Sequence, residues 1–196
     1  MLSPMELMEI SSTIRASRIL RNFIEDIEAE GDISIPHFIE RKEQLPVLTG
    51  LQHEINDCID ENGAVLDSAS STLRSIRQSL RSEEAKVRGK LESLIRGSNA
   101  AKMLSDAIIT IRNDRFVIPV KQEYRGHYGG IVHDQSSSGQ TLFIEPDAVV
   151  QANNEVQRLK VKEQAEIERI LLELSAKVQE VAHEIFVLVG LLGEID

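Results

Sequence analysis

The sequence predicts a mainly α-helical protein with a small β-containing insertion, in which long antiparallel helices are capped by a mixed α/β module. Three observations support this fold class. Residues 106–150 alternate apolar and polar side chains with period two and are interrupted by glycines and a serine run, which is typical of short strands joined by turns. The flanking segments are long, charged and poor in glycine and proline, as helices are. Aromatic residues are only 4% of the 196 residues and tryptophan is absent, which favours helical packing.

The composition limits the compartment and the class of function. Apolar residues make up 41% of the chain and charged residues 28%, which are ordinary values for a soluble protein. The formal net charge of −10 argues against a protein that coats nucleic acid along its whole surface, but it leaves a local basic site possible. The single cysteine, Cys58, fits a reducing cytoplasm. No secretory signal is recognised, and the longest apolar run, residues 185–192, is far shorter than the roughly 20 residues that span a bilayer, so we expect a cytoplasmic protein without membrane contact.

The segment 1–64 is predicted to be a helical core part. Ser3-Pro4 is a good helix start, and Glu6 can complete a capping box, so a first helix is expected to run through about residue 28 and to end at Gly31-Asp32. A shorter helix is predicted over residues 34–46. Residues 49–63 are expected to be connective.

Two later segments carry narrow apolar stripes with three- and four-residue spacing. Residues 66–96 are predicted to form the helix of an outgoing lever, segment 65–98, about 46 Å long at ~1.5 Å per residue. The segment 147–196 is predicted to be a returning lever helix of roughly 70 Å. Because neither stripe can be buried alone, we expect an antiparallel pair with the clamp, residues 99–146, at its far tip. The alternative is an ordinary helical bundle in which residues 106–145 are a surface insertion.

The chain lacks the usual patterns of a catalytic or metal site. It has no GxxxxGK[ST] loop and no GxGxxG after a strand, and its five histidines and Cys58 lack metal-ligand spacing. His133-Asp134 beside the serine run suggests a catalytic triad, but neighbours on a strand point to opposite faces. We therefore expect no catalytic residue, metal or cofactor in this chain. Residues 134–139 are predicted to be a turn whose hydroxyls and backbone donors bond the backbone or a ligand phosphate.

The β module differs in charge from the rest of the chain. Between Arg96 and Gly130 there are six basic and three acidic residues, which gives +3 and leaves −13 for the remainder of the −10 chain. A local basic patch on an acidic protein is typical of phosphate contact, and the alternative is a solvated face. Such contact would be weakly sequence-selective, because no segment resembles a helix that reads the major groove. The candidate nucleic-acid contacts are Arg112, Arg115, Lys121, Arg125, His127, Ser136, Ser137 and Ser138.

The same module resembles a known family. The segments that carry the resemblance are RNDRFVIPVK at 112–121, YR at 124–125, GGIVHDQSSSG at 129–139, TLFIEP at 141–146 and Asn153-Asn154-Glu155. Together they are similar to the second bacterial branch of the MutS superfamily, the recombination-suppressing paralogues with a C-terminal Smr nuclease domain. The resemblance covers nearly the whole chain, as the core, lever and clamp regions of that family.

The resemblance implies a much longer parent protein, a homodimeric ATP-driven clamp. Its ATPase domain, which uses ATP and Mg²⁺, and its Smr endonuclease would lie outside this chain, so the chain alone is not expected to be an enzyme. The implied partner is branched or duplex DNA, with the parent suppressing homologous recombination. The implied alternative is an arm of a collided-ribosome sensor that splits stalled ribosomes in ribosome quality control and contacts rRNA or ribosomal protein.

Overall fold

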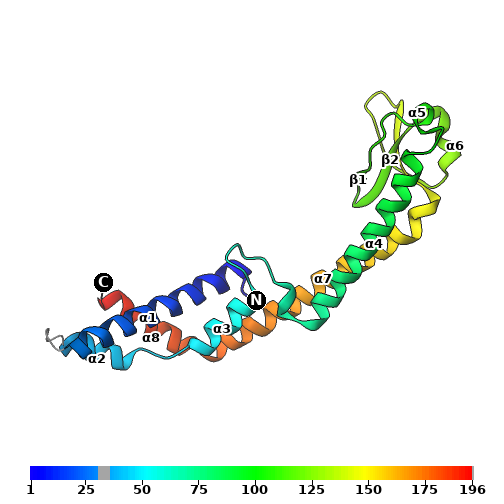
Figure 1. The fold of residues 1–196 in the computed structure, drawn as a ribbon. Coiled ribbons are helices and arrows are strands. Elements are labelled where there is room, and N and C mark those ends of the chain that lie inside the picture. The colour runs from blue at the N-terminus through cyan, green and yellow to red at the C-terminus, as the bar shows by residue number, and fades with distance from the viewer. Residues whose placement is uncertain (31–35, 196) are drawn as a thin grey trace. The chain divides into compact units, whose positions relative to one another are not determined.

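The chain divides into two compact units, each described here by itself. The computed structural model describes residues 1–30 and 36–195 (Figure 1). The first unit contains Met1–Arg74 and Ala165–Asp196, and the second contains Ser75–Gln164. Most elements are helices, and the strands form one small antiparallel sheet in the second unit. The predicted class, mainly α with a small β-containing insertion, is confirmed at this level.

The first unit is helical. It contains α1 (Pro4–Glu30), α2 (Pro36–Gln44), α3 (Thr49–Cys58), the 3₁₀ turn η1 (Asp67–Ala69), the end of α7 (Asp147–Glu180) and α8 (Ala182–Ile195). Leu7, Ile55, Leu73 and Ile170 are buried together in its core. The predicted capping box is confirmed, since the Ser3 amide donates to Glu6 Oε2 at 2.7 Å and the Glu6 amide to Ser3 Oγ at 3.3 Å. The predicted helix end at Gly31-Asp32 lies outside the described residues.

Three expectations about helix limits were wrong. Residues 49–63 are not simply connective, because α3 forms there without a side-chain cap and is held by the burial of Ile55. The outgoing helix α4 (Ser71–Ile95) starts later than the predicted residue 66. Ser70 caps its N-terminus, because Ser70 Oγ accepts the Leu73 amide at 2.9 Å. The returning helix is not continuous: Val181 separates α7 from α8, and its amide bonds the carbonyl of Val178, three residues back.

The second unit holds the sheet. Its strands are β1 (Thr110–Arg112), β2 (Arg115–Lys121), β3 (Ile131–Gln135) and β4 (Thr141–Glu145), in the antiparallel order β1-β2-β4-β3. The β1–β2 hairpin turns at Asn113 and Asp114, whose φ angles of 49° and 60° are those of the two-residue turns that match strand twist. Short helices α5 (Ala100–Met103) and α6 (Arg125–Tyr128) and the 3₁₀ turn η2 (Gln122–Tyr124) complete the module.

Within the second unit, α4 and α7 pack antiparallel and share one apolar core with the sheet (Figure 1). Arg77 Nε lies 2.7 Å from Glu163 Oε1, and Lys90 Nζ lies 3.2 Å from the carbonyl of Ala148. Residue numbers therefore rise along α4 in the direction in which they fall along α7, so the two helices are antiparallel. The core residues are Val87, Leu91, Phe116, Ile118, Val120, Leu142, Ile144, Val149 and Val156. None of the described helices has the length and apolar character that crossing a membrane requires.

Candidate nucleic-acid interface

The candidate contact residues fall into two groups near opposite ends of strand β2. Arg112 and Arg115 flank the β1–β2 turn. Lys121 ends β2, about 20 Å from Arg115 at ~3.3 Å per residue, and α6 with Arg125 and His127 follows soon after. The two groups differ in whether their charges already have partners.

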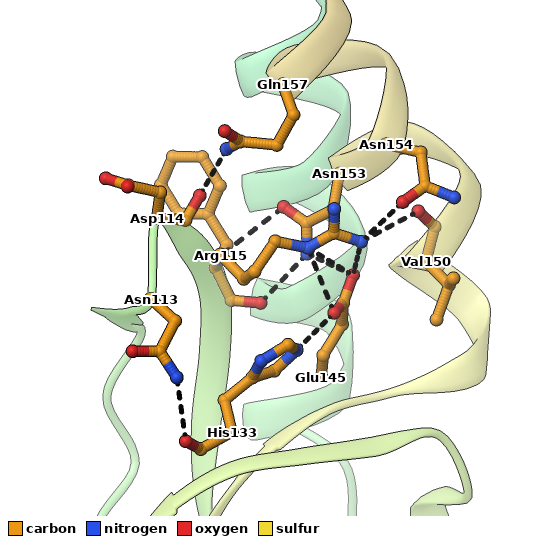
Figure 2. A network of polar contacts seen from close by, with 10 residues as sticks. Asn113, Asp114, Arg115, His133, Glu145, Val150, Asn153, Asn154 and Gln157 are labelled. Carbon is orange, nitrogen blue, oxygen red and sulfur yellow. Dashed lines mark hydrogen bonds and ion pairs between the residues drawn. The ribbon is translucent and has the colours of Figure 1, made fainter.

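Arg115 is held by a buried carboxylate (Figure 2). The Glu145 side chain is 0% exposed, and Arg115 donates to it from Nη2 at 2.5 Å and from Nε at 3.1 Å. His133 Nε2 lies 2.5 Å from the same carboxylate, and Asn153 Nδ2 donates to it at 2.9 Å. Burial alone would raise the pKa of Glu145, but the hydrogen bonds from Arg115, His133 and Asn153 outweigh it and hold this pKa below its ordinary value. The carboxylate is therefore ionised and Arg115 is neutralised by it.

Arg112 is also compensated. Its Nε lies 3.1 Å from Asp134 Oδ2, and its guanidinium covers the Phe143 ring at 4.2 Å from the centroid. Next to it, Asn113 Nδ2 donates to the carbonyl of His133 at 3.0 Å, so the β1–β2 turn lies against strand β3 (Figure 2). Since His133 turns to Glu145 and Asp134 to Arg112, the two do not orient each other as a catalytic pair would.

Within residues 1–30 and 36–195, the other end of β2 carries basic side chains that form no ion pair with a carboxylate, and we call Lys102, Lys121, Arg125 and His127 the free basic end. Lys121 Nζ donates to the carbonyl of Lys102 at 2.9 Å, and the Lys102 ammonium lies 5.8 Å from the centroid of the Tyr124 ring. Arg125 and His127 are exposed on α6. In the part of the chain that the structure describes, none of these lysines and arginines makes an ion pair with a carboxylate.

The turn that contains Ser136, Ser137 and Ser138, which we call the serine turn, lies at the same end of the sheet as Lys121. Lys121 is paired with Thr141 in the β2–β4 register, and the Ser136 amide donates to the carbonyl of Thr141 at 2.9 Å. Ser136 Oγ accepts the Thr141 amide at 3.1 Å, and Ser138 Oγ lies 3.3 Å from Ser136 Oγ, while Ser137 is exposed. The residues that line the adjoining shallow pocket are Ser105, Lys121, Gln122, Glu123, Gln140 and Thr141. The fold thus places a lysine, hydroxyls and one carboxylate around one polar hollow.

Three residues that matter to the module were not among the contact candidates predicted from the sequence. Glu145 and Asn153 organise Arg115, and Lys102 contributes to the free basic end. The glutamate that ends the apolar strand TLFIE was the available signal for Glu145, because a buried carboxylate requires cationic or hydrogen-bonding partners. Residues 1–30 and 36–195 contain no group of three or more histidine, cysteine or acidic side chains placed to hold a metal ion.

The comparison with known proteins agrees with the family resemblance that residues 112–146 and 153–155 carry. No protein-family model matches the chain. The chain is 58% identical over 191 residues to an endonuclease MutS2 of Halalkalibacterium halodurans, covering 97% of the chain and 24% of that protein. It is 58% identical over 195 residues to an endonuclease MutS2 of a Geobacillus species and 55% identical over 195 residues to a putative endonuclease MutS2 of Bacillus subtilis, covering 100% of the chain and 25% of each protein. The chain thus matches a MutS2 segment along its whole length and spans about a quarter of these relatives.

Proposed function

We propose that this chain is the lever and clamp segment of a MutS2 protein and that its sheet-containing unit contacts the phosphate backbone of duplex or branched DNA. The premise is the match along the whole chain to proteins named endonuclease MutS2. ATP hydrolysis with Mg²⁺, endonuclease action and homodimer formation then belong to the longer parent, whose role is to suppress homologous recombination in the cytoplasm. The segment itself supplies contact rather than chemistry.

The observation that carries this proposal is the free basic end. Arg112 and Arg115 are already compensated by Asp134 and Glu145, so a phosphate gains little from them. Lys102, Lys121 and Arg125 carry three positive charges without ion-paired carboxylates in the described residues, and the serine turn adds hydroxyl donors beside Lys121. Neutralising about three phosphates of B-DNA gives a slope of about −2.7 in a plot of log affinity against log salt concentration.

The test is the salt dependence of binding by the 196-residue chain to a fluorescent four-way junction and to a duplex. Lys121→Ala and Arg125→Ala should each reduce the size of the slope by about 1, because each removes one phosphate contact. Lys162→Ala is the matched control, since Lys162 is exposed on α7 in the same unit and loses the same charge. A flat slope for the unmodified chain, or slopes unchanged by both substitutions, would count against phosphate contact at this end.

The second candidate is an arm that engages collided ribosomes. It is favoured by exposed apolar side chains on α8, where Phe186 is 78% and Val189 52% exposed, because such residues suit a protein partner. The free basic end would then contact rRNA phosphates. Cosedimentation of a MutS2 protein carrying this segment with stacked or single ribosomes separates the candidates. Preference for DNA junctions, with equal sedimentation on both ribosome samples, would reject the ribosomal role.

A further inference from the structure

Strand β4 ends at Glu145, before it can supply a backbone hydrogen-bond partner for Phe116 of its neighbour β2. The register pairs Ile118 with Ile144 and Pro119 with Phe143, so continued pairing would place Phe116 opposite Pro146. Proline has no backbone N–H and cannot donate to the carbonyl of Phe116. Phe116 is buried, and a buried carbonyl without a donor is costly. Another group must therefore complete the ladder at this point.

The side chain of Asn153 takes the place of the missing strand residue (Figure 2). Asn153 lies on α7 and is 0% exposed. Its Nδ2 donates to the carbonyl of Phe116 at 3.1 Å, and its Oδ1 accepts the amide of Phe116 at 3.3 Å. The second hydrogen of Nδ2 serves Glu145 Oε1 at 2.9 Å. One carboxamide thus makes both hydrogen bonds that a strand partner would make and also reaches the buried carboxylate.

Other contacts extend this attachment along one face of α7. Arg115 Nη2 donates to Asn154 Oδ1 at 2.7 Å and lies 3.5 Å from the carbonyl of Val150, and Gln157 Nε2 donates to the carbonyl of Asp114. Positions 150, 153, 154 and 157 follow the i, i+3, i+4, i+7 pattern of one helix face. The β1–β2 hairpin is therefore bonded to two successive turns of α7.

Helix α4 meets the same strand differently. Val87 and Leu91 share the apolar core with Phe116, and the Arg88 guanidinium lies 4.8 Å from the centroid of the Phe116 ring. Apolar burial is non-directional, and packed helices can shift slightly while they keep it. Hydrogen bonds among buried groups lose their geometry on a similar shift. The two helices thus differ in how firmly they hold the strand.

We propose that Asn153, with Arg115 and Glu145, fastens the β1–β2 hairpin to helix α7, so that hairpin and helix move as one body while α4 shifts against the sheet. Because Lys121 ends the same strand, a displacement of α7 within this unit also carries the free basic end. Asn153 is in this sense a positioning residue that contacts no ligand. This attachment is the same whether the ligand of the parent protein is DNA or rRNA.

The test measures distances between spin labels in a Cys58→Ser background. Labels at Ile111 on β1, Arg158 on α7 and Lys86 on α4 use exposed positions and are introduced in pairs. We expect a narrower 111–158 distance distribution than 111–86. Asn153→Leu, which keeps a similar volume but removes the carboxamide, should broaden 111–158 and leave 86–158 unchanged. Gln151→Ala, on the exposed side of α7, is the control and should change neither. An unchanged 111–158 distribution, or equal broadening of all pairs, overturns the proposal.

A measurement on the unsubstituted chain covers the case in which Asn153→Leu does not fold. The amide hydrogen of Phe116 is bonded to the Asn153 side chain on α7 rather than to a neighbouring strand, yet it should exchange with deuterium as slowly as that of Ile118 inside the ladder. A milder variant, Asn153→Ser, should speed exchange at Phe116 by about tenfold relative to Ile118, roughly the effect of one lost hydrogen bond. Fast exchange at Phe116 in the unsubstituted chain overturns the proposal.

Discussion

Replacing Arg115 by alanine should strongly destabilise the sheet-containing unit. Glu145 is 0% exposed and Arg115 14% exposed, so the substitution leaves a buried carboxylate without its cationic partner. Removing one partner of a buried pair costs about 3–5 kcal/mol. Asn154 also loses its bond to Arg115, but Asn154 is exposed, so water replaces that bond and its loss adds little.

Tyrosine fluorescence during urea unfolding reports this loss selectively. Tyr124 and Tyr128 are the only tyrosines, both lie in the second unit, and the chain has no tryptophan. With a slope of about 1.5 kcal/mol per M urea, a loss of 3–5 kcal/mol lowers the midpoint by about 2–3 M. Arg158→Ala is the matched control, because the Arg158–Glu155 pair is exposed in the same unit and should leave the midpoint unchanged.

A double variant separates the buried charge from simple loss of packing. Arg115→Met/Glu145→Leu removes both charges and keeps apolar volume, so it should be more stable than Arg115→Ala alone. If Arg115→Ala shifts the midpoint no more than Arg158→Ala does, or if the double variant is the less stable one, the assignment of Arg115 to a buried structural pair is wrong.

Three further predictions concern single positions. The folded-state pKa of Glu145 lies below its ordinary 4.5, so its contribution to stability is full above pH 4.5 and is lost as pH falls through the folded pKa. Acid titration of the tyrosine signal should show this loss of stability, and Glu145→Gln should make the loss smaller. Gly130→Ala should lower the urea midpoint and Gly126→Ala should not, because a Cβ at Gly130 (φ 80°) would lie 1.9 Å from the carbonyl oxygen of Glu145, whereas the space beside Gly126 is open. Cys58 should react with iodoacetamide at pH 8.5 more slowly in the folded chain than in urea, because burial, together with the charge of Asp57, raises the pKa of its thiol; equal rates would contradict this.

Elements with a local signal were predictable from the sequence. The capping box at Ser3 and Glu6 and the strands of residues 106–150 follow from short-range patterns. Helix α3 lacks a cap, and its formation depends on burial against residues distant in sequence, such as Leu7 and Ile170. The break between α7 and α8 lies at Val181 and involves neither proline nor glycine, the residues that usually indicate a helix end in a sequence, so it was not predicted.

For the site, composition located the basic module but not its free charges. Whether an arginine is available to a ligand depends on carboxylates brought close by folding, and Glu145 is 30 residues from Arg115. His133 and Asp134 do contact different partners, Glu145 and Arg112, but the strand does not alternate regularly there, because a β-bulge lies between Val132 and Asp134. The role of the Asn153 side chain in place of a strand partner could not be predicted, because predicting it requires both the β2–β4 register and the position of α7.

The most direct test of nucleic-acid contact is photo-crosslinking in cells from a MutS2 protein that carries this segment. A photoreactive residue at Ser137, exposed on the serine turn beside Lys121, samples the free basic end, and one at exposed Ser82 on α4 is the comparison. We expect DNA to be captured from position 137 and not from position 82. Capture of rRNA would favour the ribosomal role, and capture of neither nucleic acid from position 137 would contradict phosphate contact at this end of the sheet.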